Sequence, residues 1–172
     1  NGPVISVYDS KNAYPFMVSK DLRKKSSKEI SGRFFDVLIG AYLLNPLKSD
    51  YAVEDIASEH LDRVMPTFKQ EFPKMTPAKA YNEKQDALIS YYCDIAGVAY
   101  DAYEILKEKL EQAQMLELFT ETEMPLSVVL GEMEEEGVIV KPDELKTYGD
   151  ELQEKIEVLE KRIHNAAGED FS

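Results

Sequence analysis

The chain has 172 residues, of which 44% are hydrophobic and 31% charged, and its formal net charge is −13. This length suffices for one ordinary domain or parts of two, and the composition is that of a soluble protein with an apolar core. Acidic surfaces repel the phosphate backbone, so the chain alone is expected to bind DNA weakly or not at all. No stretch approaches the roughly 20 apolar residues of a membrane span.

Cysteine usage and the N-terminal residues predict a cytoplasmic location. The single cysteine, Cys93, excludes an intrachain disulfide and suits a reducing compartment. The apolar run Val4–Val7 is too short for the core of a signal peptide. Cys93 lies in a tyrosine-rich helical pattern, where we expect a small buried apolar side chain rather than a nucleophile.

The N-terminal segment predicts a strand that ends at a carboxylate. Residues Val4–Tyr8 have a strand-like pattern and Asp9 follows them. The favoured interpretation of Asp9 is the cap of the next helix, because aspartate caps backbone amides well. The next segment, Ser10–Gly32, is basic, and a solvated surface is expected, with phosphate contact as the alternative. Its basic residues are Lys20, Arg23, Lys24, Lys25 and Lys28.

The middle of the chain predicts a short strand and several helices. A strand is expected near Arg33–Asp36, and Asp36 is expected to cap the apolar helix that runs to Asn45. A short amphipathic helix follows at Asp50–Leu61, where His60 is expected to complement the negative C-terminal end of the helix dipole. The longest helical pattern spans Pro77–Leu118. Its predicted apolar face consists of Leu88, Tyr91, Ile95, Val98, Ala102, Ile105 and Leu110.

The last third predicts two helices separated by a stop. Gly137 follows the first helix, where a left-handed residue is needed, and Val138–Val140 favours an extended strand. Pro142 suits the first turn of the second helix, which Gly168 ends. The apolar stripe of the first helix is Leu126, Val129, Leu130 and Met133, and that of the second is Leu145, Tyr148, Leu152, Ile156, Leu159 and Ile163.

Several short motifs together resemble one family. They are Glu123-Met124-Pro125-Leu126, Met133 followed by Gly137-Val138, Glu151-Leu152, Ala167-Gly168-Glu169-x-Phe171, and Phe35-Asp36 followed by Ala41–Pro46. This combination resembles bacterial DNA polymerase I (family A), where the 3′–5′ exonuclease-like domain passes into the polymerase thumb. The resemblance implies a partial ribonuclease H-like exonuclease domain over residues 1–122 and thumb helices over 123–172. The expected fold is mostly α with a few short strands (α+β).

The resemblance also identifies vestigial site residues. In the family an aspartate matching Asp9 binds catalytic metal ions, and a later helix carries a tyrosine with an aspartate four residues on. Here Tyr91 is followed four residues later by Ile95, and Asp94 is displaced by one position, which turns it to another face of the helix. The family's early Asp-x-Glu pair is missing. Hydrolysis by two metal ions needs several converging carboxylates. We therefore expect Asp9, Tyr91 and Asp94 to form no intact catalytic site, with Asp9 the only candidate metal ligand and no cofactor in this chain.

For the parent protein the resemblance implies a nucleotidyltransferase that makes DNA in replication and repair. It would use Mg²⁺ and a DNA primer–template, in the bacterial cytoplasm with the nucleoid. The chain itself is expected to be an inactive scaffold and thumb base. An active 3′–5′ proofreading exonuclease and a helical protein-interaction module remain as alternatives. Because much of the expected sheet is missing, the apolar side chains of Phe34–Tyr42 are expected to favour dimerisation or a rearranged packing.

Overall fold

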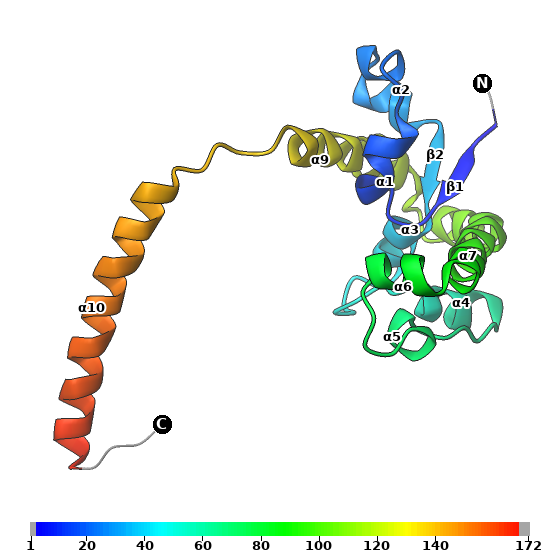
Figure 1. Ribbon diagram of the computed structural model, residues 1–172. Coiled ribbons are helices and arrows are strands. Elements are labelled where there is room, and N and C mark those ends of the chain that lie inside the picture. The colour runs from blue at the N-terminus through cyan, green and yellow to red at the C-terminus, as the bar shows by residue number, and fades with distance from the viewer. Residues whose placement is uncertain (1–2, 169–172) are drawn as a thin grey trace. The chain divides into compact units, whose positions relative to one another are not determined.

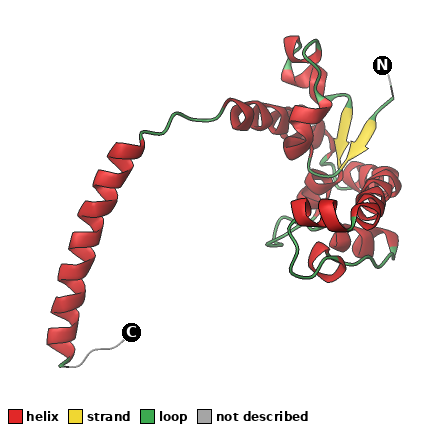
Figure 2. Cartoon of the chain, viewed as in Figure 1, coloured by secondary structure: helices red, strands yellow, loops and turns green. Residues whose placement is uncertain are grey.

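The structure is a computed structural model that describes residues 3–168 (Figure 1). The chain divides into two compact units, Asn1–Glu136 and Gly137–Ser172. Helices dominate both units, and two short strands lie in the first (Figure 2). The prediction of a mostly helical chain with a few short strands is confirmed. In the described part of the chain, every helix is too short or too polar to span a lipid bilayer.

The first unit begins with a small parallel sheet. Strands β1 (Ile5–Val7) and β2 (Phe34–Asp36) pair in parallel, with Ser6 opposite Phe35. Parallel strands need a crossover connection, and this one contains α1 (Ser10–Met17), the 3₁₀ turn η1 (Leu22–Lys24) and α2 (Ser27–Ser31). Both strands lie where the sequence predicts them.

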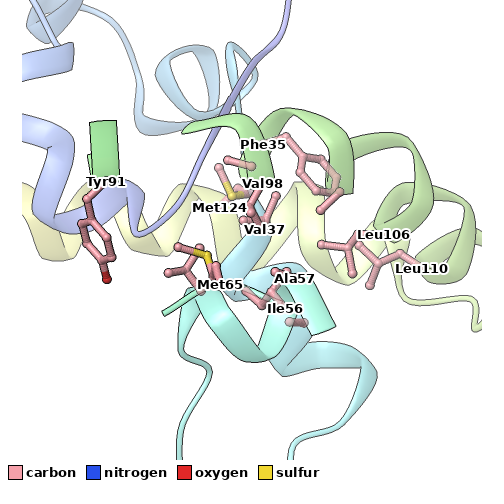
Figure 3. Close-up of a cluster of buried hydrophobic side chains, with 14 of the residues drawn as sticks. Phe35, Val37, Ile56, Ala57, Met65, Tyr91, Val98, Leu106, Leu110 and Met124 are labelled. Atoms are coloured by element: carbon pink, nitrogen blue, oxygen red, sulfur yellow. The ribbon is translucent and has the colours of Figure 1, made fainter. Parts of the chain in front are cut away.

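A helical layer packs beneath the sheet and contains most of the core. Its helices are α3 (Val37–Leu44), α4 (Val53–Leu61), α5 (Phe68–Glu71), α6 (Pro77–Glu83) and α7 (Gln85–Gln112). Figure 3 shows buried side chains of α7, among them Val98, Leu106 and Leu110, in one cluster with Phe35 of β2 and Val37 of α3. The apolar face predicted for α7 is confirmed for every member except Ile105, which is half-buried and is replaced in the core by its neighbour Leu106.

The core also changes the expectation for Phe34–Tyr42. Phe35 and Val37 are 4% and 0% exposed, and the Phe35 ring lies 4.9 Å from that of Tyr103 and 4.6 Å from that of Phe119. Only Tyr42 in the predicted apolar group is largely exposed, at 41%. Helix α7 and the turn at Phe119 therefore supply partners within the unit, and these side chains do not need a second copy to cover them.

The helical pattern predicted over Pro77–Leu118 is interrupted rather than continuous. Helix α6 ends at Glu83, and after α7 the chain makes a turn in which Gln114 has a φ of 58°, outside the helical region. A short helix α8 (Leu116–Leu118), the π-helical turn η2 (Phe119–Glu123) and α9 (Met124–Glu136) follow. The apolar spacing continues through both breaks, which is why periodicity alone does not reveal them.

Helix α9 buries a different face from the one that its sequence suggests. The predicted stripe is exposed, with Leu126 at 45% and Met133 at 63%, whereas Met124, Val128 and Gly131 are buried. Gly131 explains the choice: a Cβ added there would lie 2.9 Å from Cβ and Cγ of Tyr14. The missing side chain lets α9 approach α1 closely, so the small residue specifies the contact.

Polar contacts close the junction of α9 with the crossover segment. The Tyr14 hydroxyl donates to Glu132 at 2.9 Å, and the Ser10 and Ser127 hydroxyls lie 2.7 Å apart. The basic residues of Ser10–Gly32 are exposed, as predicted, but several pair with carboxylates. These ion pairs are Lys11–Glu134, Arg23–Glu135, Lys28–Glu121, Lys24–Asp21 and Lys25–Glu29. Much of the positive charge that could meet phosphate is thus already neutralised by the protein.

The second unit consists of a short connection and one long helix. Gly137 adopts the predicted left-handed conformation, with a φ of 73°, but Val138–Val140 forms no strand, so that prediction is wrong. A strand needs a hydrogen-bonding neighbour, and none pairs with these residues within 3–168. Helix α10 (Pro142–Ala167) begins at Pro142 and ends at Gly168, as predicted. The compact first unit extends to Glu136, so α9 packs with it, while the domain boundary expected at residue 122 stays a prediction.

Candidate functional site

Asp9 lies directly after β1 and caps helix α1. Its backbone is left-handed, with a φ of 61°, and its Oδ1 accepts a hydrogen bond from the Asn12 amide at 3.3 Å. Oδ2 accepts from the Asn12 side-chain amide. The favoured interpretation of Asp9 as a helix cap is confirmed. Both carboxylate oxygens are therefore engaged in holding the start of α1.

The buried carboxylate of this region is Asp36, which is 1% exposed. Its oxygens accept from the backbone amides of Asp9 at 3.2 Å, Ser10 at 2.6 Å and Leu38 at 2.9 Å. Burial raises the pKa of Asp36, and these hydrogen bonds, chiefly from Ser10, oppose the rise. As predicted, Asp36 caps α3, and it also ties the ends of the two strands together.

Tyr91 and Asp94 lie on α7 and point to different surroundings. Tyr91 is buried against the rings of Phe68 and Phe72, with centroid distances of 5.8 and 5.9 Å, and burial raises the pKa of its hydroxyl. Asp94 is exposed and forms an ion pair with Arg63, whose Nη2 lies 3.0 Å from Oδ1. Tyr91 therefore contributes to the core, and Asp94 to a surface contact between α7 and the loop after α4.

The structure does not assemble Asp9, Tyr91 and Asp94 into one site. Within residues 3–168 no three histidine, cysteine, aspartate or glutamate side chains converge so that they could hold a metal ion. The hydrogen bonds of Asp9 go to Asn12 and Asp36, and the carboxylate of Asp94 goes to Arg63. What these residues do in the described structure is to cap helices, fill the core and join neighbouring segments.

Two sequence interpretations need correction. Cys93 is exposed rather than buried, because it lies two positions, or about 200° of rotation, beyond the core-facing Tyr91. His60 does not carry charge to the end of α4. Burial, followed by the charge of Lys109, lowers its pKa, and Lys109 Nζ lies 2.8 Å from His60 Nδ1. The neutral ring accepts this hydrogen bond.

No sequence pattern indicates one further feature of the described structure, a pocket between helices. It has a volume of about 550 Å³ and lies where α3, α4 and α7 meet. Its lysine and histidine members, Lys48, His60 and Lys109, come from three separate segments. No spacing rule joins residues so far apart in the chain, so only the fold brings them together.

Comparison with known proteins finds similarity to one kind of bacterial protein. No family model matches the chain, and no solved structure matches it. The chain is 35% identical over 166 residues to DNA polymerase I of Bacillus subtilis (strain 168), a match that covers 96% of the chain and 18% of that protein. It is 29% identical over 167 residues to DNA polymerase I of Geobacillus stearothermophilus, covering 97% of the chain and 18% of the relative.

A third relative is matched over a similar share of the chain and the same share of its own length. The chain is 31% identical over 163 residues to DNA polymerase I of Streptococcus pneumoniae (strain ATCC BAA-255 / R6), which covers 95% of the chain and 18% of the relative. The chain thus spans less than a fifth of the length of the curated relatives it matches. The resemblance expected from the sequence motifs is confirmed: over nearly all its length the chain corresponds to one region of the bacterial DNA polymerase I proteins.

Proposed function

We propose that this chain is a catalytically inactive exonuclease-like scaffold, followed by the base of the thumb, within a DNA polymerase I. The parent protein would perform template-directed DNA synthesis in replication and repair, in the bacterial cytoplasm. The main support is the match of nearly the whole chain to one region of DNA polymerase I proteins. The small parallel sheet with helices beside it is compatible with part of a ribonuclease H-like domain.

The lack of exonuclease activity is inferred from how the acidic residues are engaged. Hydrolysis by two metal ions needs carboxylates that converge on ions roughly 4 Å apart. Asp9 accepts hydrogen bonds at the start of α1, and Asp94 forms an ion pair with Arg63 on an exposed surface. These residues do not fit a pair of divalent ions, so no cutting step is assigned to this chain. The Mg²⁺ ions of the parent polymerase would be bound outside it.

The expected partner of the parent protein is a DNA primer–template, whereas this chain alone would bind DNA weakly. Its net charge is −13, and three basic residues of the crossover segment, Lys11, Arg23 and Lys28, pair with carboxylates of α9 and η2. Helix α10 carries Lys146, Lys155, Lys161 and Arg162, for which no ion pair is found among residues 3–168. We propose this helix as the part that approaches phosphates.

A proofreading assay on the full-length protein tests the proposal. A labelled primer with a mismatched 3′ end is incubated with template and Mg²⁺ or Mn²⁺, without nucleotides and then with them. We expect extension of a matched primer and no shortening of the mismatched one. Removal of the mismatched nucleotide would favour the active exonuclease instead. Absence of any extension by an otherwise folded full-length protein would contradict the polymerase assignment.

A further inference from the structure

The pocket between α3, α4 and α7 combines an apolar wall with a polar rim. Its volume of about 550 Å³ is within the range of small-molecule sites. The apolar wall consists of Ala41, Leu44, Ile56 and Ala113, and the rim includes Asn45, Tyr51 and Gln112. The lysines Lys48 and Lys109 bring positive charge to this rim in a chain with a net charge of −13.

The two lysines differ in how their charge is balanced. Lys48 Nζ lies 2.6 Å from Glu59 Oε1 and 3.5 Å from Asp55 Oδ2, so carboxylates already surround it. Lys109 has no carboxylate within 4.0 Å among the described residues, and its ammonium contacts Nδ1 of His60. An ammonium has only protons to donate, so His60 accepts and carries its own proton on Nε2.

The ammonium of Lys109 is therefore held in place by His60, and no carboxylate among the described residues balances its charge. The uncharged His60 ring fixes the position of the ammonium without neutralising it, whereas the charge of Lys48 is balanced by Glu59 and Asp55. Among residues 3–168, Glu59 is the only acidic residue that lines the pocket. Charge-assisted hydrogen bonds are the strong ones, so an anionic group beside Lys109 would gain more here than at a lysine already paired with a carboxylate.

We propose that this pocket binds a small organic anion, in which a single phosphate or carboxylate group lies beside Lys109 and an apolar ring or short chain lies against Leu44 and Ile56. The anionic group would pair with the ammonium of Lys109, and the apolar part of the ligand would pack against Ala41, Leu44 and Ile56. Neither part alone uses both features of the pocket. This inference is independent of the proposed polymerase function.

Titration of the ¹⁵N-labelled chain with phenyl phosphate and with benzoate tests the site. Inorganic phosphate and phenol are titrated separately, because the first carries only the charge and the second only the ring. We expect saturable amide shifts confined to the pocket residues of α3, α4 and α7. Binding of phenyl phosphate or benzoate should be at least about tenfold tighter than that of phosphate or phenol, as expected when two contacts act together.

Variants on the same helix separate this site from general attraction to lysines. Lys109→Gln should weaken binding at least about tenfold, the effect of losing one charge-assisted contact. Lys107→Gln is the matched control, because Lys107 lies over the Tyr103 ring at 5.9 Å and does not line this pocket. If Lys109→Gln does not fold, as judged by circular dichroism, Gln112→Glu places a repelling carboxylate at the same rim and should weaken binding too.

Three results would overturn the proposal. The first is shifts that do not saturate or that spread equally over surface lysines. The second is unchanged binding in Lys109→Gln or Gln112→Glu. The third is equal weakening in Lys107→Gln. Saturable local shifts that need both the charge and the ring, and that are lost only in the pocket variants, would establish it.

Discussion

Helices α7 and α10 are almost equally long, with 28 and 26 residues, yet they differ in what they bury. Both carry a continuous apolar stripe in the sequence. Helix α7 buries seven side chains against α3, α4 and the aromatic residues of α5, whereas α10 buries none within its own unit. An apolar stripe in the sequence therefore predicts a face that favours burial, but it does not show whether the same compact unit provides the surface that buries it.

The largest expected difference is between two leucine-to-alanine substitutions. Leu106 in α7 is 0% exposed, and Leu152 in α10 is 39% exposed. Leu106→Ala should lower the free energy of unfolding by about 2–5 kcal/mol, because it leaves a cavity in the core. Leu152→Ala should change it by less than about 0.5 kcal/mol. Urea unfolding followed by circular dichroism measures both. Equal losses would show that α10 has a partner of the same quality as α7.

A second comparison uses one substitution in two helices. Gly131→Ala in α9 places a Cβ 2.9 Å from Tyr14 and 3.3 Å from the Lys11 carbonyl oxygen, so α1 and α9 must move apart. We expect a loss of about 1–3 kcal/mol, typical of overpacking. Gly149→Ala in α10 meets nothing within 4 Å and should stabilise its helix by about 0.5–1 kcal/mol.

The two glycine variants are read by different measurements. The thermal midpoint of the first unit reports Gly131→Ala, and the helical content at low temperature reports Gly149→Ala. Stabilisation of the first unit by Gly131→Ala would mean that α1 and α9 are not in close contact. A Tyr14→Gly background should reduce the cost of Gly131→Ala, because both atoms that lie 2.9 Å from the added Cβ, the Cβ and Cγ of Tyr14, are then absent.

The contact between His60 and Lys109 of α7 predicts that the stability of the first unit depends on pH. Burial and the charges of Lys109 on α7 and Lys48 after α3 lower the pKa of His60, while Glu59 on α4 opposes this. In the unfolded chain the pKa is near 6.5, so below that pH the unfolded state takes up a proton more readily than the folded state. The stability should be highest above about pH 6.5 and fall as the pH drops through the lowered pKa.

Unfolding midpoints measured across this pH range check the prediction, with His60→Gln as the control that lacks the titrating ring. The decrease should be smaller in His60→Gln than in the original chain. An identical pH profile in the two proteins would show that His60 is not responsible. Burial raises the pKa of Asp36, so the difference between the two pH profiles, rather than the pH range alone, isolates His60.

The smallest effect is expected at Asp94. Its ion pair with Arg63 is exposed, and such pairs contribute at most about 1 kcal/mol. Asp94→Ala should therefore have little effect on stability, and millimolar Mg²⁺ should not change the unfolding midpoint of either protein. A midpoint raised by Mg²⁺ in the original chain and unchanged in Asp94→Ala would show that the carboxylate binds metal.

Local sequence signals predicted the parts of the fold that depend on neighbouring residues. The strands, the caps at Asp9 and Asp36, the core face of α7 and the glycine stop at Gly168 follow from turn chemistry, capping and periodicity. The predictions failed where tertiary contact decides. Helix α9 buries the face that contains Gly131 instead of the predicted apolar stripe, because Gly131 allows close approach to α1. Val138–Val140 forms no strand, because no strand among residues 3–168 pairs with it. The pocket of Lys48, His60 and Lys109 depends on three distant segments, which no local pattern connects.

The connection after α9 has a practical consequence. Gly137 has open space around its α-carbon, and Val138 and Ile139 are 87% and 100% exposed, with no regular hydrogen-bonded structure around them. Proteases bind their substrates as extended, accessible peptide, so an elastase-type enzyme that accepts valine should nick the chain here first. The nick would cut the backbone at the boundary between the two compact units and leave the buried core of the first unit on one piece of chain, which offers a simple preparative route to that unit.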